Sequence, residues 1–152
     1  MIKENEQLSF EEVLSKLIRY CNYQARSEQE VFFKANELTS DDDIVLKLTD
    51  FLKQEKYIDD VKFAEVFVKG KMNQKRWGKY KIKEGLRQKG VSPRTIEHTL
   101  SAIDQQQYLE NLQTLVEKRT KKLKLDREEK TKVYRYLLSK GYESGLILEH
   151  IG

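Results

Sequence analysis

The stretch WGKYKIKEGLRQKGVSP, residues 77–93, decides the fold. Within it Gly90 is expected to end a helix in the left-handed conformation that glycine tolerates. Ser92 followed by Pro93 is the favoured order of residues at the start of the next helix. The segment LRQKG at 86–90 returns 51 residues later as LLSKG at 137–141. The same helix–turn–helix pattern is therefore expected to occur more than once along the chain.

Apolar positions extend this repeat in both directions. At the same offset of 51 residues Ile82 matches Val133, Ile96 matches Ile147 and Leu100 matches Ile151. A shift of 51 residues toward the N-terminus matches Val31 with Ile82 and Ala35 with Leu86. The first copy is looser, because Thr39 stands where the other two copies have glycine. We predict an all-α protein of three tandem three-helix repeats, at residues 1–58, 59–103 and 104–152. Small units of this kind are expected to stack into an elongated, curved array.

Helix start signals agree with nine helices. Capping boxes, in which Ser is followed three residues later by Glu, stand at Ser9 and Ser27. Further starts are expected at residues 40–43, 59–60, 77–78 and 92–93, and the last three helices at about 104–124, 126–140 and 144–150. Apolar residues recur at helical spacing, as at Phe63, Phe67 and Lys71 with Ala64 and Val68 beside them, and no segment alternates long enough to indicate a strand.

Charge divides the chain unevenly. Residues 1–60 hold 8 Lys/Arg and 14 Asp/Glu, whereas residues 61–95 hold 11 Lys/Arg and only 2 acids; residues 96–152 are nearly balanced. The middle block should therefore attract polyanions such as nucleic acid.

The candidate binding residues lie in this block and in a second basic cluster. They are Lys69, Lys71, Lys75, Arg76, Lys79, Tyr80, Lys83 and Arg87, then Lys118, Arg119 and Lys122. On the expected helix after Gly78, the outer face carries the basic residues and Tyr80, and the inner face carries Ile82, Gly85 and Leu86, where Gly85 would let a neighbour approach. A well-solvated helix face is the alternative for the first cluster, and complementing the helix dipole is the alternative for the second.

Two interpretations remain open for Trp77, which could stack on a base or anchor a loop to a core. The phenylalanines at 32, 33, 63 and 67 are expected to pack.

Catalysis finds little support in the sequence. His98 and His150 are far apart, and Cys21 is the single cysteine, so neither zinc spacing nor an internal disulfide is present. The run of acids at 41–43 lacks the pattern of a calcium loop. We expect no enzyme activity, no metal and no cofactor. The first residues lack an apolar run, and we expect a cytoplasmic protein without a membrane span.

Three stretches together resemble the RecX family of bacterial recombination regulators. The first is YCNYQARSEQE, residues 20–30; the second runs from Tyr57-Ile58-Asp59-Asp60 through Lys69-Gly70-Lys71 and Trp77-Gly78 to Lys89-Gly90-Val91; the third is LLSKGYE, residues 137–143, with Ile147. The first repeat departs from the family in having no Lys-Gly turn, and the N-terminal extension is short.

The resemblance implies three three-helix repeats and a modulator of RecA, usually an inhibitor. Such a protein docks along the RecA–single-stranded DNA filament and so affects recombination, DNA repair and the SOS response without being an enzyme. We expect a monomer whose basic middle repeat faces DNA phosphates or an acidic filament surface. A stand-alone DNA-binding protein and a helical scaffold for an acidic protein are the alternatives. Changing Lys79, Lys83 and Arg87 to Glu is expected to abolish filament binding and keep the fold.

Overall fold

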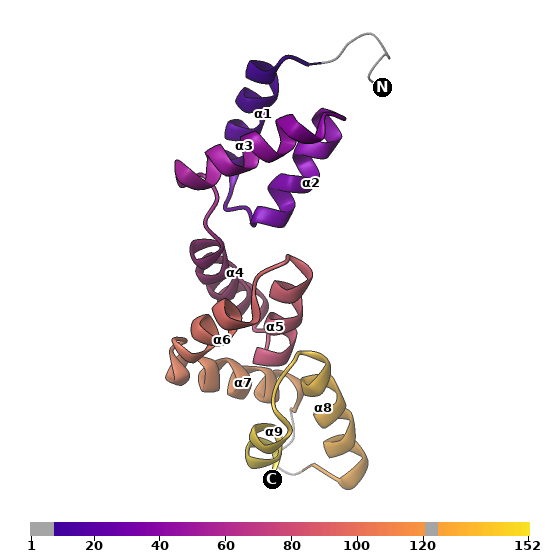
Figure 1. Ribbon diagram of the computed structural model, residues 1–152. Coiled ribbons are helices and arrows are strands. Elements are labelled where there is room, and N and C mark those ends of the chain that lie inside the picture. The colour runs from indigo at the N-terminus through magenta and orange to yellow at the C-terminus, as the bar shows by residue number, and fades with distance from the viewer. Residues whose placement is uncertain (1–7, 121–124) are drawn as a thin grey trace. The chain divides into compact units, whose positions relative to one another are not determined.

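A computed structural model describes residues 8–120 and 125–152, and every regular element in these ranges is an α-helix (Figure 1). The helices are α1 (Phe10–Tyr23), α2 (Glu28–Leu38), α3 (Asp42–Gln54), α4 (Asp60–Lys75), α5 (Lys79–Gln88), α6 (Pro93–Ser101), α7 (Gln105–Arg119), α8 (Arg127–Ser139) and α9 (Ser144–Ile151). The predicted all-α fold of helical repeats is confirmed.

Two compact units divide the chain. One ends at Phe63 and also includes Lys89–Val91; the other comprises Ala64–Gln88 and Ser92–Gly152. In the first unit α1, α2 and α3 pack on one another around a core of Val13, Leu17, Val31, Ala35, Val45, Leu48, Leu52 and Ile58. Both predicted capping boxes are present, because the Ser9 and Ser27 hydroxyls each accept the backbone N–H three residues on.

The second unit buries the matching positions of the later repeats. Ile82, Leu86, Leu137 and Ile147 are fully buried and Val133 nearly so, as the shared offset predicts. In α5 the predicted split is confirmed, with Ile82 and Leu86 inside and Lys83, Arg87 and Tyr80 exposed.

The turns explain why the first repeat differs from the others. Gly90 and Gly141 have φ angles of 79° and 97°, which confirms the left-handed conformation expected after α5 and α8. Thr39 ends α2 with φ −150°, an extended conformation that needs no glycine. The first repeat therefore leaves its second helix by a different turn.

Two expectations are corrected. The seventh helix ends at Arg119, because Thr120 is extended, and the expected continuation falls on residues 121–124, outside the described part. Phe32 and Phe33 do not belong to the core, since they are 39% and 56% exposed. The core of the first unit is filled by the other face of α2, at Val31 and Ala35.

Candidate nucleic-acid interface

Trp77 lies at the centre of a cluster of cations and rings at the start of the second unit. The Lys71 and Lys81 ammonium nitrogens are 4.7 and 4.8 Å from the centre of the Trp77 ring. Phe67 meets the indole at 6.4 Å between ring centres in an edge-on arrangement. We call these four residues the Trp77 cluster. Two ammonium groups this close to an indole favour cation–π stabilisation, and they place positive charge next to a half-buried ring.

Gly85 of α5 makes this arrangement possible. A Cβ atom at Gly85 would lie 2.7 Å from the Phe67 ring and 3.6 Å from the Trp77 ring. The close approach expected at Gly85 is thus confirmed, and the neighbour that uses it is a side chain of α4. Trp77 therefore packs beside Phe67 and Gly85, with the Lys71 and Lys81 ammonium groups within 5 Å of its ring centre.

The link between α4 and α5, residues Lys75–Lys79, is fixed by the turn between α8 and α9. The Gly78 N–H donates to the Lys140 carbonyl at 2.7 Å, and the Tyr80 N–H donates to the Gly141 carbonyl at 3.0 Å. A Cβ at Gly78 would overlap the Gly141 and Tyr142 backbone. We call this interlocking of the link with residues 140–143 the repeat clasp.

Side chains of the third repeat complete the repeat clasp. The Lys140 ammonium donates to the Lys75 carbonyl and the Tyr142 hydroxyl to the Arg76 carbonyl, each at 2.8 Å. Arg76 has φ 51°, a left-handed conformation that is unfavourable for a residue with a side chain. The clasp thus holds a strained residue in place and brings the Lys140 cation beside the candidate residues of the middle repeat.

A buried tyrosine pair lies beneath the clasp. The Tyr108 hydroxyl accepts the Lys79 N–H at 2.9 Å and donates to the Glu143 carboxylate. Tyr108 and Tyr142 are fully buried, with ring centres 5.3 Å apart. Burial raises the pKa of both hydroxyls, and for Tyr108 the hydrogen bond to Glu143 raises it further. Both rings therefore remain neutral hydrogen-bond donors.

The structure separates the predicted residues of the middle repeat. Lys71 joins the Trp77 cluster, and Lys75, Tyr80 and Lys83 are exposed. Three others have local contacts. Lys69 lines a groove on another side of α4, and the Lys79 ammonium lies 5.2 Å from the centre of the Tyr108 ring. Arg87 forms an ion pair with Glu84 at 2.6 Å. Lys81, which was not among the predicted residues, belongs to the cluster; its position four residues after Trp77 was the available signal.

The second basic cluster has a separate setting on α7 and α8. The Arg119 guanidinium stacks 3.5 Å above the Tyr136 ring, and Lys118 is exposed. Arg119 also lines a small hollow with Lys132 and Glu129. Lys122 lies outside the described residues. Stacking on Tyr136 leaves the Arg119 charge near the surface, so it stays a candidate contact.

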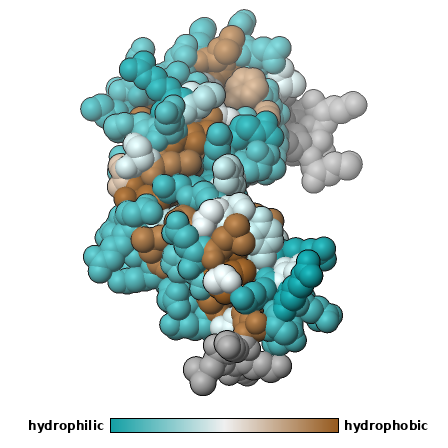
Figure 2. Space-filling view, turned by 90° about the horizontal axis from the view of Figure 1, so that it is seen from below, coloured by the Kyte–Doolittle hydropathy of each residue, from teal (hydrophilic) through white to brown (hydrophobic). Residues whose placement is uncertain are grey.

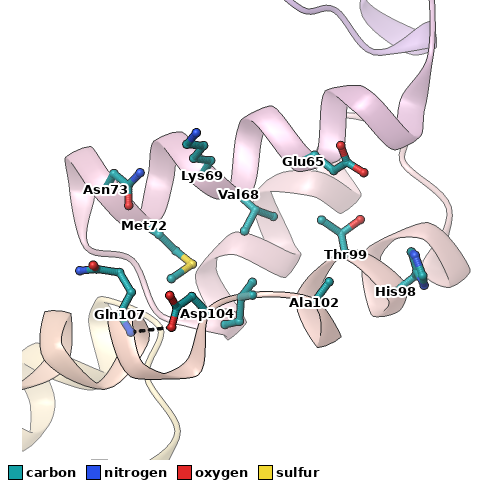
Figure 3. Close-up of a pocket in the computed structure, with 11 residues that line it drawn as sticks. Glu65, Val68, Lys69, Met72, Asn73, His98, Thr99, Ala102, Asp104 and Gln107 are labelled. Carbon is teal, nitrogen blue, oxygen red and sulfur yellow. Dashed lines mark hydrogen bonds between the residues drawn. The ribbon is translucent and has the colours of Figure 1, made fainter.

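A groove of about 510 Å³ lies between α4, α6 and the start of α7 (Figure 3). Val68 and Met72 point into it from α4, while Asp104, opposite, accepts the Gln107 N–H as the cap of α7. Its carboxylate therefore has a structural role. Within residues 8–120 and 125–152, no group of three His, Cys, Asp or Glu side chains could hold a metal ion. None of the helices described there is long and apolar enough to cross a bilayer.

Hydrophilic side chains cover most of the face drawn in Figure 2, with apolar residues in small clusters. This agrees with a chain in which charged residues make up 36% of the sequence.

Comparison with known proteins gives one consistent result. A family model described as the second three-helix domain of RecX matches residues 59–100, and one for the third three-helix domain matches residues 105–151. Regulatory protein RecX of Clostridium botulinum (strain Alaska E43 / Type E3) is 38% identical over 126 residues, which is 80% of this chain and 58% of the relative. Its counterpart from Clostridium tetani is 33% identical over 129 residues, 82% of this chain and 59% of the relative.

A solved structure is similar as well. The crystal structure of RecX from Lactobacillus salivarius has a TM-score of 0.84 and 26% identity, covering 93% of this chain and 94% of that one. The chain spans somewhat under three-fifths of the length of the two clostridial relatives.

Proposed function

This chain belongs to the RecX family, and we propose that it regulates the RecA recombinase, as an inhibitor that binds the RecA–single-stranded DNA filament. By regulating RecA, the protein would affect recombination, DNA repair and the SOS response. These processes place it in the cytoplasm. It includes a non-catalytic mode of action, a monomeric chain, and three repeats at 1–58, 59–103 and 104–152.

The Trp77 cluster is the observation that supports this proposal most directly. A half-buried indole flanked by Lys71 and Lys81 combines a ring with charges that suit phosphates. Lys75 and Lys83 are further exposed cations at the end of α4 and on α5, and the only acid of α5, Glu84, is paired with Arg87. A net positive surface with few competing carboxylates favours a polyanion or an acidic face of the filament.

The repeat clasp gives this surface its rigidity. Four hydrogen bonds from the α8–α9 turn and its side chains hold the Lys75–Lys79 link and Tyr80. A binding surface that is ordered before association loses less conformational entropy when it binds. We therefore propose that the second and third repeats bind the filament as one body.

The test changes exposed cations that have no structural role. The variant Lys75→Glu with Lys83→Glu should lose inhibition of RecA-catalysed, DNA-dependent ATP hydrolysis, measured with pre-formed filaments, and should keep its far-UV circular dichroism spectrum. These residues replace Lys79 and Arg87 as targets, because those two contact Tyr108 and Glu84. Unchanged inhibition would overturn the proposed surface.

A matched control carries the same charge change elsewhere. Lys47 of α3 and Lys62 of α4 are exposed and belong to neither candidate cluster, and the variant with both changed to Glu should inhibit like the wild type. Equal loss in both variants would show that net charge alone matters.

Direct DNA binding is the second candidate, and the ring within the Trp77 cluster favours it. Binding to single-stranded DNA should then be equally tight with and without RecA, with a salt slope of about −0.7 per phosphate contact.

A further inference from the structure

The first repeat has a net negative charge, but it carries a pocket lined by basic residues. A hollow of about 360 Å³ between α1 and α2 is lined by Lys16, Arg19, Tyr20, Tyr23, Arg26, Lys34 and Leu38. We call it the Tyr23 pocket. Four of its seven residues are cationic, two are tyrosines and none is acidic, although residues 1–60 hold 14 Asp/Glu against 8 Lys/Arg.

Two of the three acids of α2, Glu28 and Glu30, pair with cations outside the Tyr23 pocket. Glu28 pairs with Lys53 at 3.1 Å, and Glu30 pairs with Lys89 at 3.3 Å while its other oxygen accepts the Ser27 N–H. Glu37, which pairs with Lys34 at 3.4 Å, is the acid that touches the lining. Lys16 and Arg19 are exposed, and neither they nor Arg26 form an ion pair with another residue that the structure describes.

Contacts with Tyr20 fix the orientation of the Arg26 guanidinium in the pocket. The Arg26 Nε donates to the Tyr20 carbonyl at 3.0 Å, and the guanidinium lies 3.7 Å above the Tyr20 ring. This fixes the plane of the guanidinium and leaves its terminal nitrogens as donors. A planar, pre-oriented guanidinium suits the two oxygens of a phosphate group.

Tyr23 supplies the second element of recognition. It is 81% exposed, the Arg26 guanidinium lies 5.8 Å from its ring, and it contributes nothing to the core of its unit. Neighbouring Ser27 and Glu30 have a structural role as the capping box of α2. An exposed ring beside fixed cations is the arrangement that stacks an unpaired base and neutralises its backbone.

We propose that the Tyr23 pocket binds single-stranded nucleic acid, with a base stacked on Tyr23 and phosphates held by Arg26, Lys16 and Arg19. The volume is at the small end of ligand sites, which suits a nucleotide more than a folded partner. Stacking requires an unpaired base, so a duplex is excluded from this mode. The site is separate from the Trp77 cluster and does not depend on RecA.

The first experiment measures fluorescence anisotropy of labelled oligo-dT with the whole chain, without RecA. Tyr23→Ala should weaken binding on the order of ten-fold, the effect of one lost base stack, whereas Tyr23→Phe should bind like the wild type. Lys16→Gln with Arg19→Gln should reduce the salt slope by about 1.4, two single-strand phosphate contacts. Lys47→Gln, on α3 and outside the pocket, should leave the slope unchanged.

The second experiment locates the contact. Oligonucleotides carrying 5-iodouracil crosslink to stacked rings on irradiation, and peptide mapping should place an adduct at Tyr23 or Tyr20. Adducts confined to residues 64–88, together with unchanged affinity of Tyr23→Ala, would overturn the inference and leave the Lys75 and Lys83 test of RecA inhibition unaffected. Equal competition by polyglutamate and oligo-dT, with no effect of Tyr23→Ala, would likewise overturn it in favour of an acidic protein segment.

Discussion

Gly78→Ala should disrupt the repeat clasp. The added Cβ would overlap backbone atoms of Gly141 and Tyr142, which cannot rotate away as a side chain can. The link and the turn must then separate, which weakens the bonds from Gly78 to Lys140 and from Tyr80 to Gly141.

The expected loss of unfolding free energy is about 3 kcal/mol. Overpacking of this kind costs about 2 kcal/mol, and two hydrogen bonds contribute about 1 kcal/mol each. Alanine restricts the unfolded chain more than glycine does, which offsets about 0.7 kcal/mol. A loss of this size is a large part of the stability of an ordinary domain, which lies at roughly 5–15 kcal/mol.

Urea unfolding followed by circular dichroism and by fluorescence measures the effect. Trp77 is the only tryptophan and adjoins Gly78, so its emission reports on the link itself. Gly70→Ala is the matched control, because no atom lies within 4 Å of a Cβ there and the position is inside α4. The control should gain up to about 1 kcal/mol from helix propensity. Equal stability of the two variants would refute the role assigned to the clasp.

Three further predictions concern the buried polar groups. Tyr108→Phe leaves the Lys79 N–H without its acceptor and should lose about 2 kcal/mol in urea unfolding, whereas Tyr23→Phe at the surface should change stability by less than about 0.5 kcal/mol. The pKa values of Tyr108 and Tyr142 are raised in the folded protein, so above about pH 10 the native state binds more protons than the unfolded state. The melting temperature should therefore fall as the pH rises above about 10. A melting temperature that stays constant up to about pH 11 would contradict this. Ser27→Ala removes a fully buried cap of α2 and should lower the stability of the first unit by about 1–2 kcal/mol, and an unchanged midpoint would show that the cap is dispensable.

Much of the fold follows from local rules that the sequence states directly. Ser9 and Ser27 cap helices because a hydroxyl reaches the N–H three residues on, and Gly90 and Gly141 end helices because glycine alone adopts their φ angles without penalty. The apolar period also predicted which face of α5 is buried. These features depend on neighbours within a few residues, so composition and spacing suffice.

The candidate sites depended on the tertiary structure far more. Charge counting indicated the middle repeat as basic, but it could not show that Arg87 is paired with Glu84 while Lys81 flanks Trp77. It also treated the first repeat as acidic, because summed charge ignores which side chains share a face. The Tyr23 pocket exists only where α1 and α2 meet.

The sequence by itself determined where most of the described helices begin and that a helical unit repeats, since hydrogen bonds between near neighbours and the helical period are local properties. Only the tertiary structure decided that Gly78 meets Gly141, that Lys140 caps the end of α4, and that Arg119 lies over Tyr136. Those contacts result from the packing of whole helices, which sets the distance between residues that the sequence leaves far apart.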